Sequence, residues 1–77
     1  MNQNRRKRIN DIRDKISELR DELDTIREEE DEYRENIPEQ FQGNLHYEQS
    51  EEASSNMEEA VDNLDQVLDY LEEATQQ

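Results

Sequence analysis

Apolar residues recur along the first half of the chain at alternating steps of three and four residues. The series comprises Ile9, Ile12, Ile16, Leu19, Leu23, Ile26, Tyr33 and Ile37. Such spacing places one apolar stripe along an α-helix, whereas a strand would need a period of two, which appears nowhere. In heptad notation Ile9 opens the a row and Ile12 the d row, and both rows are expected to form a helix contact. The pattern predicts a first helix over residues 4–36.

The chain changes character after this segment. Pro38 disfavours helical geometry at the residue before it, so the first helix should end there. Gly43 and Asn44 are typical of turns and caps, and Asn44 is the expected N-cap of the next helix. These residues predict a loop over residues 37–44, which is long enough to reverse the chain.

A second periodic segment follows, and its apolar face is wider than one helix contact requires. Its a row comprises Tyr47, Ser54, Val61, Leu68 and Thr75, and its d row comprises Ser50, Met57, Leu64 and Leu71. A further row at position g, the alanine row, consists of Ala53, Ala60, Val67 and Ala74. This pattern predicts a second helix over residues 45–74. The expected fold is all-α: one domain over residues 1–77, folded as an antiparallel two-helix coiled-coil hairpin.

Two rows of opposite charge support the antiparallel arrangement. The arginine row occupies position e of the first helix and consists of Arg6, Arg13, Arg20, Arg27 and Arg34. Acidic residues occupy position e of the second helix. The expected pairs are Arg34 with Glu51, Arg27 with Glu58, Arg20 with Asp65, and Arg13 with Glu72. An exposed ion pair contributes only about 0.2–1 kcal/mol, so these pairs should set orientation more than stability. Glu30 falls at an a position, and it should either reach Arg27 or Arg34 or mark the register.

A hairpin of two long helices buries only the narrow line of contact between them, which we call the seam. Oligomerisation is a common remedy for so small a core. We expect a homodimer, an antiparallel four-helix bundle joined through the second helices. Its predicted interface residues are Ala53, Met57, Ala60, Leu64, Val67 and Ala74. The alternative is a monomeric hairpin that covers the alanine row only in a complex with another protein.

Composition narrows the chemistry. The 77 residues include no Cys, one Gly and one His, so disulfides, thiolate chemistry, phosphate-cradling loops and histidine-based metal sites are not expected. We expect no catalytic residue, no cofactor, no metal and no enzymatic activity. No apolar run approaches the roughly 20 residues that span a bilayer, and no signal peptide is expected, so the predicted location is cytoplasmic.

Charge is distributed unevenly within a net charge of −14. Residues 35–77 contain 12 acidic and no basic residues, whereas residues 1–34 contain all 9 basic residues and 11 acidic ones. The predicted partner-binding residues lie on the outer flank of the second helix: Glu48, Glu52, Glu59, Asp62, Asp69, Tyr70 and Glu73. Such a surface repels nucleic acid and attracts proteins with basic clefts. The basic start comprises Arg5, Arg6, Lys7 and Arg8. It is expected to be a frayed, solubilising helix end, with a weak nucleic-acid contact as the alternative.

Several short segments resemble small acidic helical proteins that bacterial phages and mobile elements encode. These segments are Pro38-Glu39, Tyr47-Glu48, Glu51-Glu52-Ala53, Met57-Glu58-Glu59-Ala60 and Leu64. The resemblance implies an inhibitor, acting in the host bacterial cytoplasm, that occupies the nucleic-acid-binding surface of a host protein such as a defence nuclease. The alternative function is a structural or assembly adaptor that packs a partner helix against the alanine-lined face of the second helix.

Overall fold

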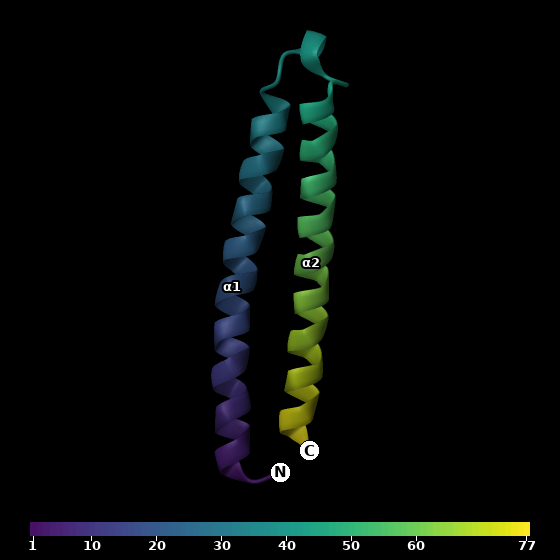
Figure 1. Cartoon of the computed structure of the whole chain (residues 1–77). Helices are drawn as coiled ribbons and strands as arrows, with labels where there is room; N and C mark the ends of the chain where they lie inside the picture. Colours follow the sequence, from purple (N-terminus) through teal and green to yellow (C-terminus); the bar gives the residue numbers. More distant parts are fainter.

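The computed structural model describes all 77 residues as two long helices joined by a short connection. Helix α1 spans Gln3–Glu35, the 3₁₀ turn η1 spans Glu39–Phe41, and helix α2 spans Leu45–Gln76. The helices lie side by side and antiparallel, so both chain ends meet at one end of the rod (Figure 1). The rod measures 60 × 14 × 13 Å. The predicted all-α antiparallel hairpin is therefore confirmed.

Asparagine caps define where each helix begins. The Asn2 side chain accepts a hydrogen bond from the backbone nitrogen of Arg5 at 2.9 Å. Asn44, the predicted N-cap, accepts one from the nitrogen of Tyr47, also at 2.9 Å. Each bond satisfies a backbone donor that has no partner within the helix. Because α1 already begins at Gln3, its basic first turns are helical in this structure, where a frayed helix end was expected.

The connection depends on one proline and one glycine. Pro38 has extended geometry, with φ −56° and ψ 144°, and its carbonyl accepts a hydrogen bond from the Phe41 nitrogen at 2.9 Å. Gly43 has φ +92°, in the left-handed region that residues with a Cβ rarely adopt. The glycine therefore lets the chain enter α2 in the reverse direction without backbone strain.

The contact face of α1 is rotated from the predicted one. The half-buried residues of α1 include its a row and the whole arginine row: Ile9, Ile16, Leu23, Glu30, Arg6, Arg13, Arg20, Arg27 and Arg34. The d row is instead exposed, with exposed fractions of 49% at Ile12, 60% at Leu19, 47% at Ile26 and 56% at Tyr33. The prediction that the d row of α1 packs in the seam is therefore wrong. Long arginine side chains can lay their methylene stems along an apolar contact, and here they replace the d row.

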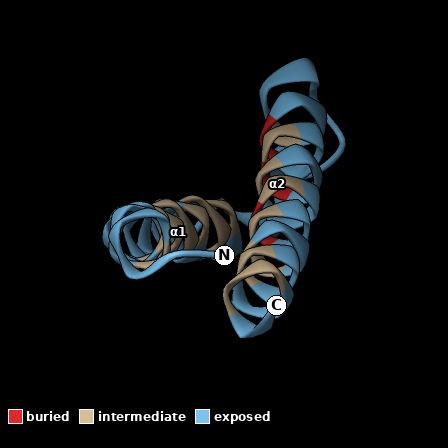
Figure 2. Cartoon of the chain, turned by 90° about the horizontal axis from the view of Figure 1, so that it is seen from below, coloured by how far each residue is buried: buried red, intermediate tan, exposed pale blue.

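The core is thin, and α2 supplies its most buried part. Val61, at 4% exposed, is the one buried apolar residue of the chain. Ser50 and Ser54 are the other two buried residues, at 5% and 6% exposed. The buried positions of α2 lie on the side that faces α1 (Figure 2). Burial is concentrated in this narrow strip, which leaves apolar side chains outside it.

Near the connection the seam is polar because Arg34 enters it. Its Nη1 donates to the Ser54 hydroxyl at 2.8 Å and to the Ser50 carbonyl at 3.1 Å. Its Nη2 donates to Asp31 at 2.9 Å. The two small serines leave room for the guanidinium group and supply acceptors for it. One side chain therefore ties the end of α1 to the start of α2.

Arg6 ties the helices together at the opposite end. Its Nε donates to the Thr75 carbonyl at 3.1 Å, and its Nη2 donates to the Gln77 carbonyl at 2.7 Å. The nitrogen of Met1 also donates to the Gln77 carbonyl, at 3.3 Å. Carbonyls at the end of an α-helix have no partner within it, and a cation there is favoured by the helix dipole. The basic start of the chain therefore stabilises the end of α2.

The contrast between Arg34 and Arg13 yields a stability prediction. Arg34→Met leaves the buried serine oxygens without their donor and leaves Asp31 with Arg27 as its one arginine partner, so the free energy of unfolding should fall by about 2 kcal/mol. Arg13 also lies at the seam, but its buried Nε has no acceptor. Arg13→Met removes that unsatisfied donor and should leave the free energy of unfolding unchanged or raise it by up to about 1 kcal/mol. Urea unfolding followed by circular dichroism, at one chain concentration, measures both.

Equal losses in the two variants would contradict this account. That result would mean that arginine stems contribute to the seam through their apolar contact alone, irrespective of the acceptors that each guanidinium group finds.

Candidate functional site

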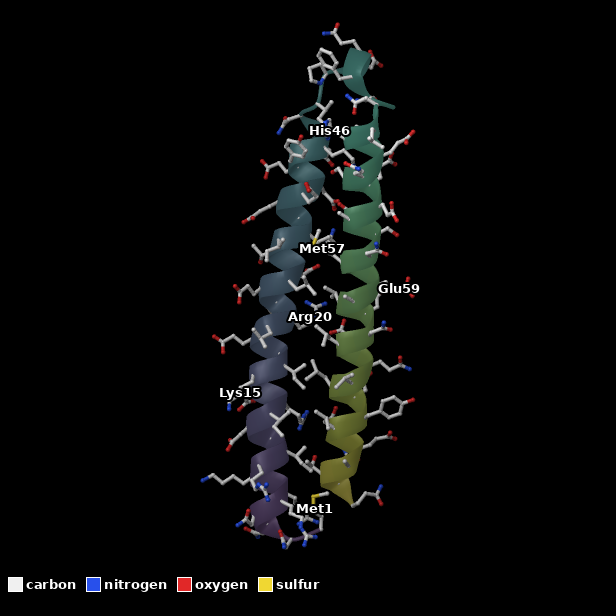
Figure 3. All side chains as sticks on the ribbon, viewed as in Figure 1. Met1, Lys15, Arg20, His46, Met57 and Glu59 are labelled. Atoms are coloured by element: carbon white, nitrogen blue, oxygen red, sulfur yellow. The ribbon has the colours of Figure 1, made fainter.

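The acidic ridge of α2 is the strongest candidate for a binding surface. We use this name for six carboxylates at positions b and f: Glu48, Glu52, Glu59, Asp62, Asp69 and Glu73. These positions lie opposite the a and d rows that face α1, and all six residues are exposed. Glu59 points away from α1, whereas Arg20 and Met57 lie between the helices (Figure 3). The structure therefore places every predicted ridge residue on one outward face.

The ridge is straight and long. Its residues are separated by steps of three, four or seven positions, which return to nearly the same side of an α-helix. At 1.5 Å per residue the distance along α2 from Glu48 to Glu73 is about 37 Å. Tyr70, the predicted aromatic anchor, borders the ridge at position c and is 63% exposed.

No ridge carboxylate has a cationic partner. Every ion pair of the molecule involves Arg20, Arg27 or Arg34. Their carboxylate partners come from α1, with Asp65 as the single exception on α2. The negative charge of the ridge is therefore uncompensated within the hairpin.

Only one of the four predicted ion pairs between the helices forms. Arg20 binds Asp65 with both prongs of its guanidinium group: Nε lies 2.8 Å from Oδ1, and Nη2 lies 3.1 Å from Oδ2. The Asp65 carboxylate accordingly raises the pKa of the Arg20 guanidinium above its usual value. Because two parallel hydrogen bonds form, this contact restricts how the two helices can shift past each other in addition to pairing opposite charges.

The other three predicted pairs are wrong, because aspartates on α1 take two of the arginines. Arg27 contacts Asp24 at 2.9 Å and Asp31 at 2.8 Å, and the Asp24 hydrogen bond raises the pKa of Arg27. Arg34 contacts Asp31 and the serines instead of Glu51. These aspartates stand three or four residues from their arginines, the spacing at which side chains of one helix meet.

Arg13 and Glu30 also depart from expectation. Arg13 donates to Asn10 at 3.2 Å and does not pair with Glu72. Glu30 is half-buried and takes part in no ion pair, so its expected contact with Arg27 or Arg34 is wrong. Asp31, one residue further on, occupies both arginines instead.

Of the predicted dimer residues, Met57 and Leu64 belong to the d row that faces α1, and the alanine row lies at the edge of that contact. Of these, Ala53, Met57, Ala60, Leu64 and Ala74 are half-buried. Val67 is 40% exposed. Larger exposed apolar side chains lie on α1, in the d row that the seam leaves out. The heptad pattern gave no sign of this surface, because it predicted that the d row lies in the core.

The structure brings together no metal-binding cluster of His, Asp or Glu side chains. His46 lies exposed in the first turn of α2. The surface hollows are each lined by four or five residues. The chemistry that the site offers is an array of free carboxylates beside one tyrosine.

Neither helix contains a stretch that is both long and apolar enough to cross a lipid bilayer. No family model, curated protein or solved structure matches this chain.

Asp31 yields a prediction about pH. The Ser54 hydroxyl and then the Arg34 guanidinium lower the pKa of the Asp31 carboxyl below its usual value of 3.8. A carboxyl whose pKa is lower in the folded chain stabilises it above the unfolded-state pKa and loses this effect as the pH falls. Asp31→Asn should therefore unfold more easily than the wild type at pH 7. The difference should shrink below about pH 4, where the carboxyl begins to protonate.

The matched control is Asp62→Asn, which removes an exposed ridge carboxylate with no cation nearby. Its free energy of unfolding at pH 7 should equal or exceed that of the wild type. A wild-type advantage over Asp31→Asn that persisted unchanged at pH 2 would contradict the assignment of this effect to the charged form of Asp31.

Proposed function

We propose that this chain is a non-enzymatic protein-binding module whose acidic ridge docks on a basic surface of another protein. The observation that carries the proposal is the uncompensated charge of α2. Of its ten carboxylates only Asp65 is paired, which leaves nine free. A second protein with clustered Lys and Arg would neutralise them, and long-range attraction would speed its approach.

The spacing of these charges favours a partner that normally binds nucleic acid. Nine free carboxylates along about 37 Å correspond to one charge per roughly 4 Å of helix. One strand of B-DNA carries a phosphate per about 3.4 Å of axis. These nine carboxylates lie at the neighbouring positions b, e and f, so a cleft built to follow a phosphate backbone meets a band of negative charge of similar density on α2. The most concrete form of the proposal is a phage or mobile-element inhibitor that occupies the nucleic-acid-binding surface of a host protein such as a defence nuclease.

A second candidate function is an adaptor that receives a partner helix along the alanine-lined face of α2. The exposure of Val67 favours it, because this side chain offers apolar contact beside alanines that permit close approach. Binding of this kind should tolerate salt and should be lost when Ala60 or Val67 is replaced by a large polar residue. Binding through the ridge should respond in the opposite way to both changes.

The test of the ridge compares two charge reversals of equal net charge. The ridge variant carries Glu59→Lys, Asp62→Lys and Asp69→Lys. The control carries Asp11→Lys, Asp14→Lys and Glu35→Lys, which are exposed residues of α1 without ion pairs. Immobilised wild-type chain and control should retain nucleic-acid-binding proteins from a bacterial lysate in about 50 mM salt. Retention should fade by about 200 mM salt as screening grows.

The ridge variant should retain none of these proteins, and short duplex DNA should displace them from the wild type. Two results would contradict the proposal: retention by the ridge variant, or capture that neither salt nor DNA reverses. Salt-resistant capture that Val67→Gln abolishes would support the adaptor function instead.

A further inference from the structure

A row of charges borders the exposed apolar row of α1, and its sign reverses at the middle of the helix. This charge row occupies position g and consists of Arg8, Lys15, Glu22 and Glu29, seven residues apart. All four side chains are exposed, and none takes part in an ion pair. Lys15 points away from α2 (Figure 3). The hairpin therefore leaves the whole row without partners.

The charges of this row are complementary to those of the same row on a second chain that runs in the opposite direction. If two α1 helices lie antiparallel about their midpoints, Arg8 faces Glu29 of the second copy and Lys15 faces Glu22 of the second copy. Twofold symmetry repeats both pairs, so opposite charges meet along the whole contact.

The same register aligns the apolar residues. Three kinds of layer result, in which a residue of row a meets one of row d of the second copy: Ile9 with Ile26, Ile12 with Leu23, and Ile16 with Leu19. This alternation is the layer pattern of an antiparallel coiled coil, in which g residues face each other beside the core. We propose that a second copy of this chain covers Ile12, Leu19 and Ile26 of the exposed apolar row, so that two hairpins form a twofold dimer through antiparallel α1 helices.

The apolar edge of α2 lies on the same face of the hairpin. One shallow hollow is bordered by Ile26 of the exposed apolar row and by Met57 of α2. The helices end level with each other, because Arg6 reaches Thr75 at one end and Arg34 reaches Ser50 at the other. An axis through the middle of α1 therefore also passes beside the middle of α2. The alanine row then meets its own reversed copy, and the result is a four-helix bundle.

The surface of the hairpin is large enough to need such a partner. Its accessible surface is 6042 Å². A compact monomer of 9.3 kDa would expose about 5,000 Å². The excess of about 1,000 Å² is comparable with the roughly 800 Å² that each partner buries in a standard protein interface.

A single apolar substitution tests the dimer. Leu19→Glu places a carboxylate in the central layer, whereas Leu45→Glu makes the same change at a residue that is similarly exposed but lies at the start of α2. In sedimentation equilibrium at tens of micromolar, the wild type and Leu45→Glu should have twice the chain mass. Leu19→Glu should have the mass of one chain and keep its helical circular dichroism, because Leu19 lies outside the hairpin seam.

A charge exchange tests the register without loss of apolar contact. Lys15→Glu and Glu22→Lys each turn two attractive pairs into two repulsive ones, so each should weaken dimerisation by about ten-fold or more. The double variant restores both pairs and the wild-type net charge, and it should dimerise as the wild type does. Lys7→Glu and Asp14→Lys repeat the single charge changes at position f, away from the contact, and should weaken dimerisation much less.

Cross-linking tests the orientation, since the chain has no cysteine of its own. When Arg8→Cys and Glu29→Cys chains are mixed, a short bismaleimide should join one variant to the other and neither variant to itself. The proposal is overturned by a monomeric wild type at 100 µM, by a dimer that Leu19→Glu leaves intact, by a double charge variant no better than its parents, or by cross-links between two Arg8→Cys chains. None of these outcomes depends on the proposed function of the acidic ridge.

Discussion

Two helices have a single line of contact, and in this chain that line buries one apolar residue, Val61. Hydrogen bonds from guanidinium groups therefore contribute unusually much to holding the rod together. Arg6 binds the end of α2, Arg20 binds its middle at Asp65, and Arg34 binds its start. Each of these guanidinium groups fixes both the separation of α1 from α2 and the position of α1 along α2. These three arginines thus fix the register of α1 against α2, and the apolar contact follows that register.

The way in which these arginines are satisfied decides the charge of the surface. Asp24 and Asp31 of the same helix neutralise Arg27, and Asp31 also binds Nη2 of Arg34. Local partners are favoured because a pair three or four residues apart on one helix needs no further ordering of the chain. As a consequence Glu51 and Glu58 of α2 remain free beside the acidic ridge, and Glu72 is free because Arg13 donates to Asn10 of its own helix instead. The anionic surface is wider than the ridge alone, and its width follows from the same competition that removed three predicted ion pairs.

The spacing of the apolar residues and the capping residues were sufficient to predict the hairpin. The spacing from Ile9 onward defined the first helix, Pro38 its end, and Asn44 the start of the second. The rotation of α1 about its axis was not predictable from the same pattern, because rows a, d and e all carry long side chains that can fill a seam. Asp31 and the two buried serines were the missed signals. Small polar residues in two core rows, opposite an arginine, indicate a guanidinium group inside the contact.

The exposed ridge followed from sequence because a helix with one apolar face must present its remaining residues outward. The identity of what it binds did not follow, since a row of carboxylates describes charge and spacing but not the shape of a partner.

The two proposed surfaces lie on different sides of the hairpin and can be used together. Positions b and f of α2 face away from the seam, whereas the dimer contact uses the edge formed by row d of α1 and the alanine row. Dimerisation would therefore leave both acidic ridges free. Because the two α2 helices are neighbours in this bundle and each ridge faces away from α1, the ridges lie antiparallel on the same side of it. Two linked ridges would bind a partner with two basic sites more tightly than either alone, because the second contact forms within one complex. The self-complementary face of α1 and the unpaired acidic ridge of α2 thus have separate physical consequences. The first raises the number of binding surfaces per particle, and the second sets what those surfaces attract.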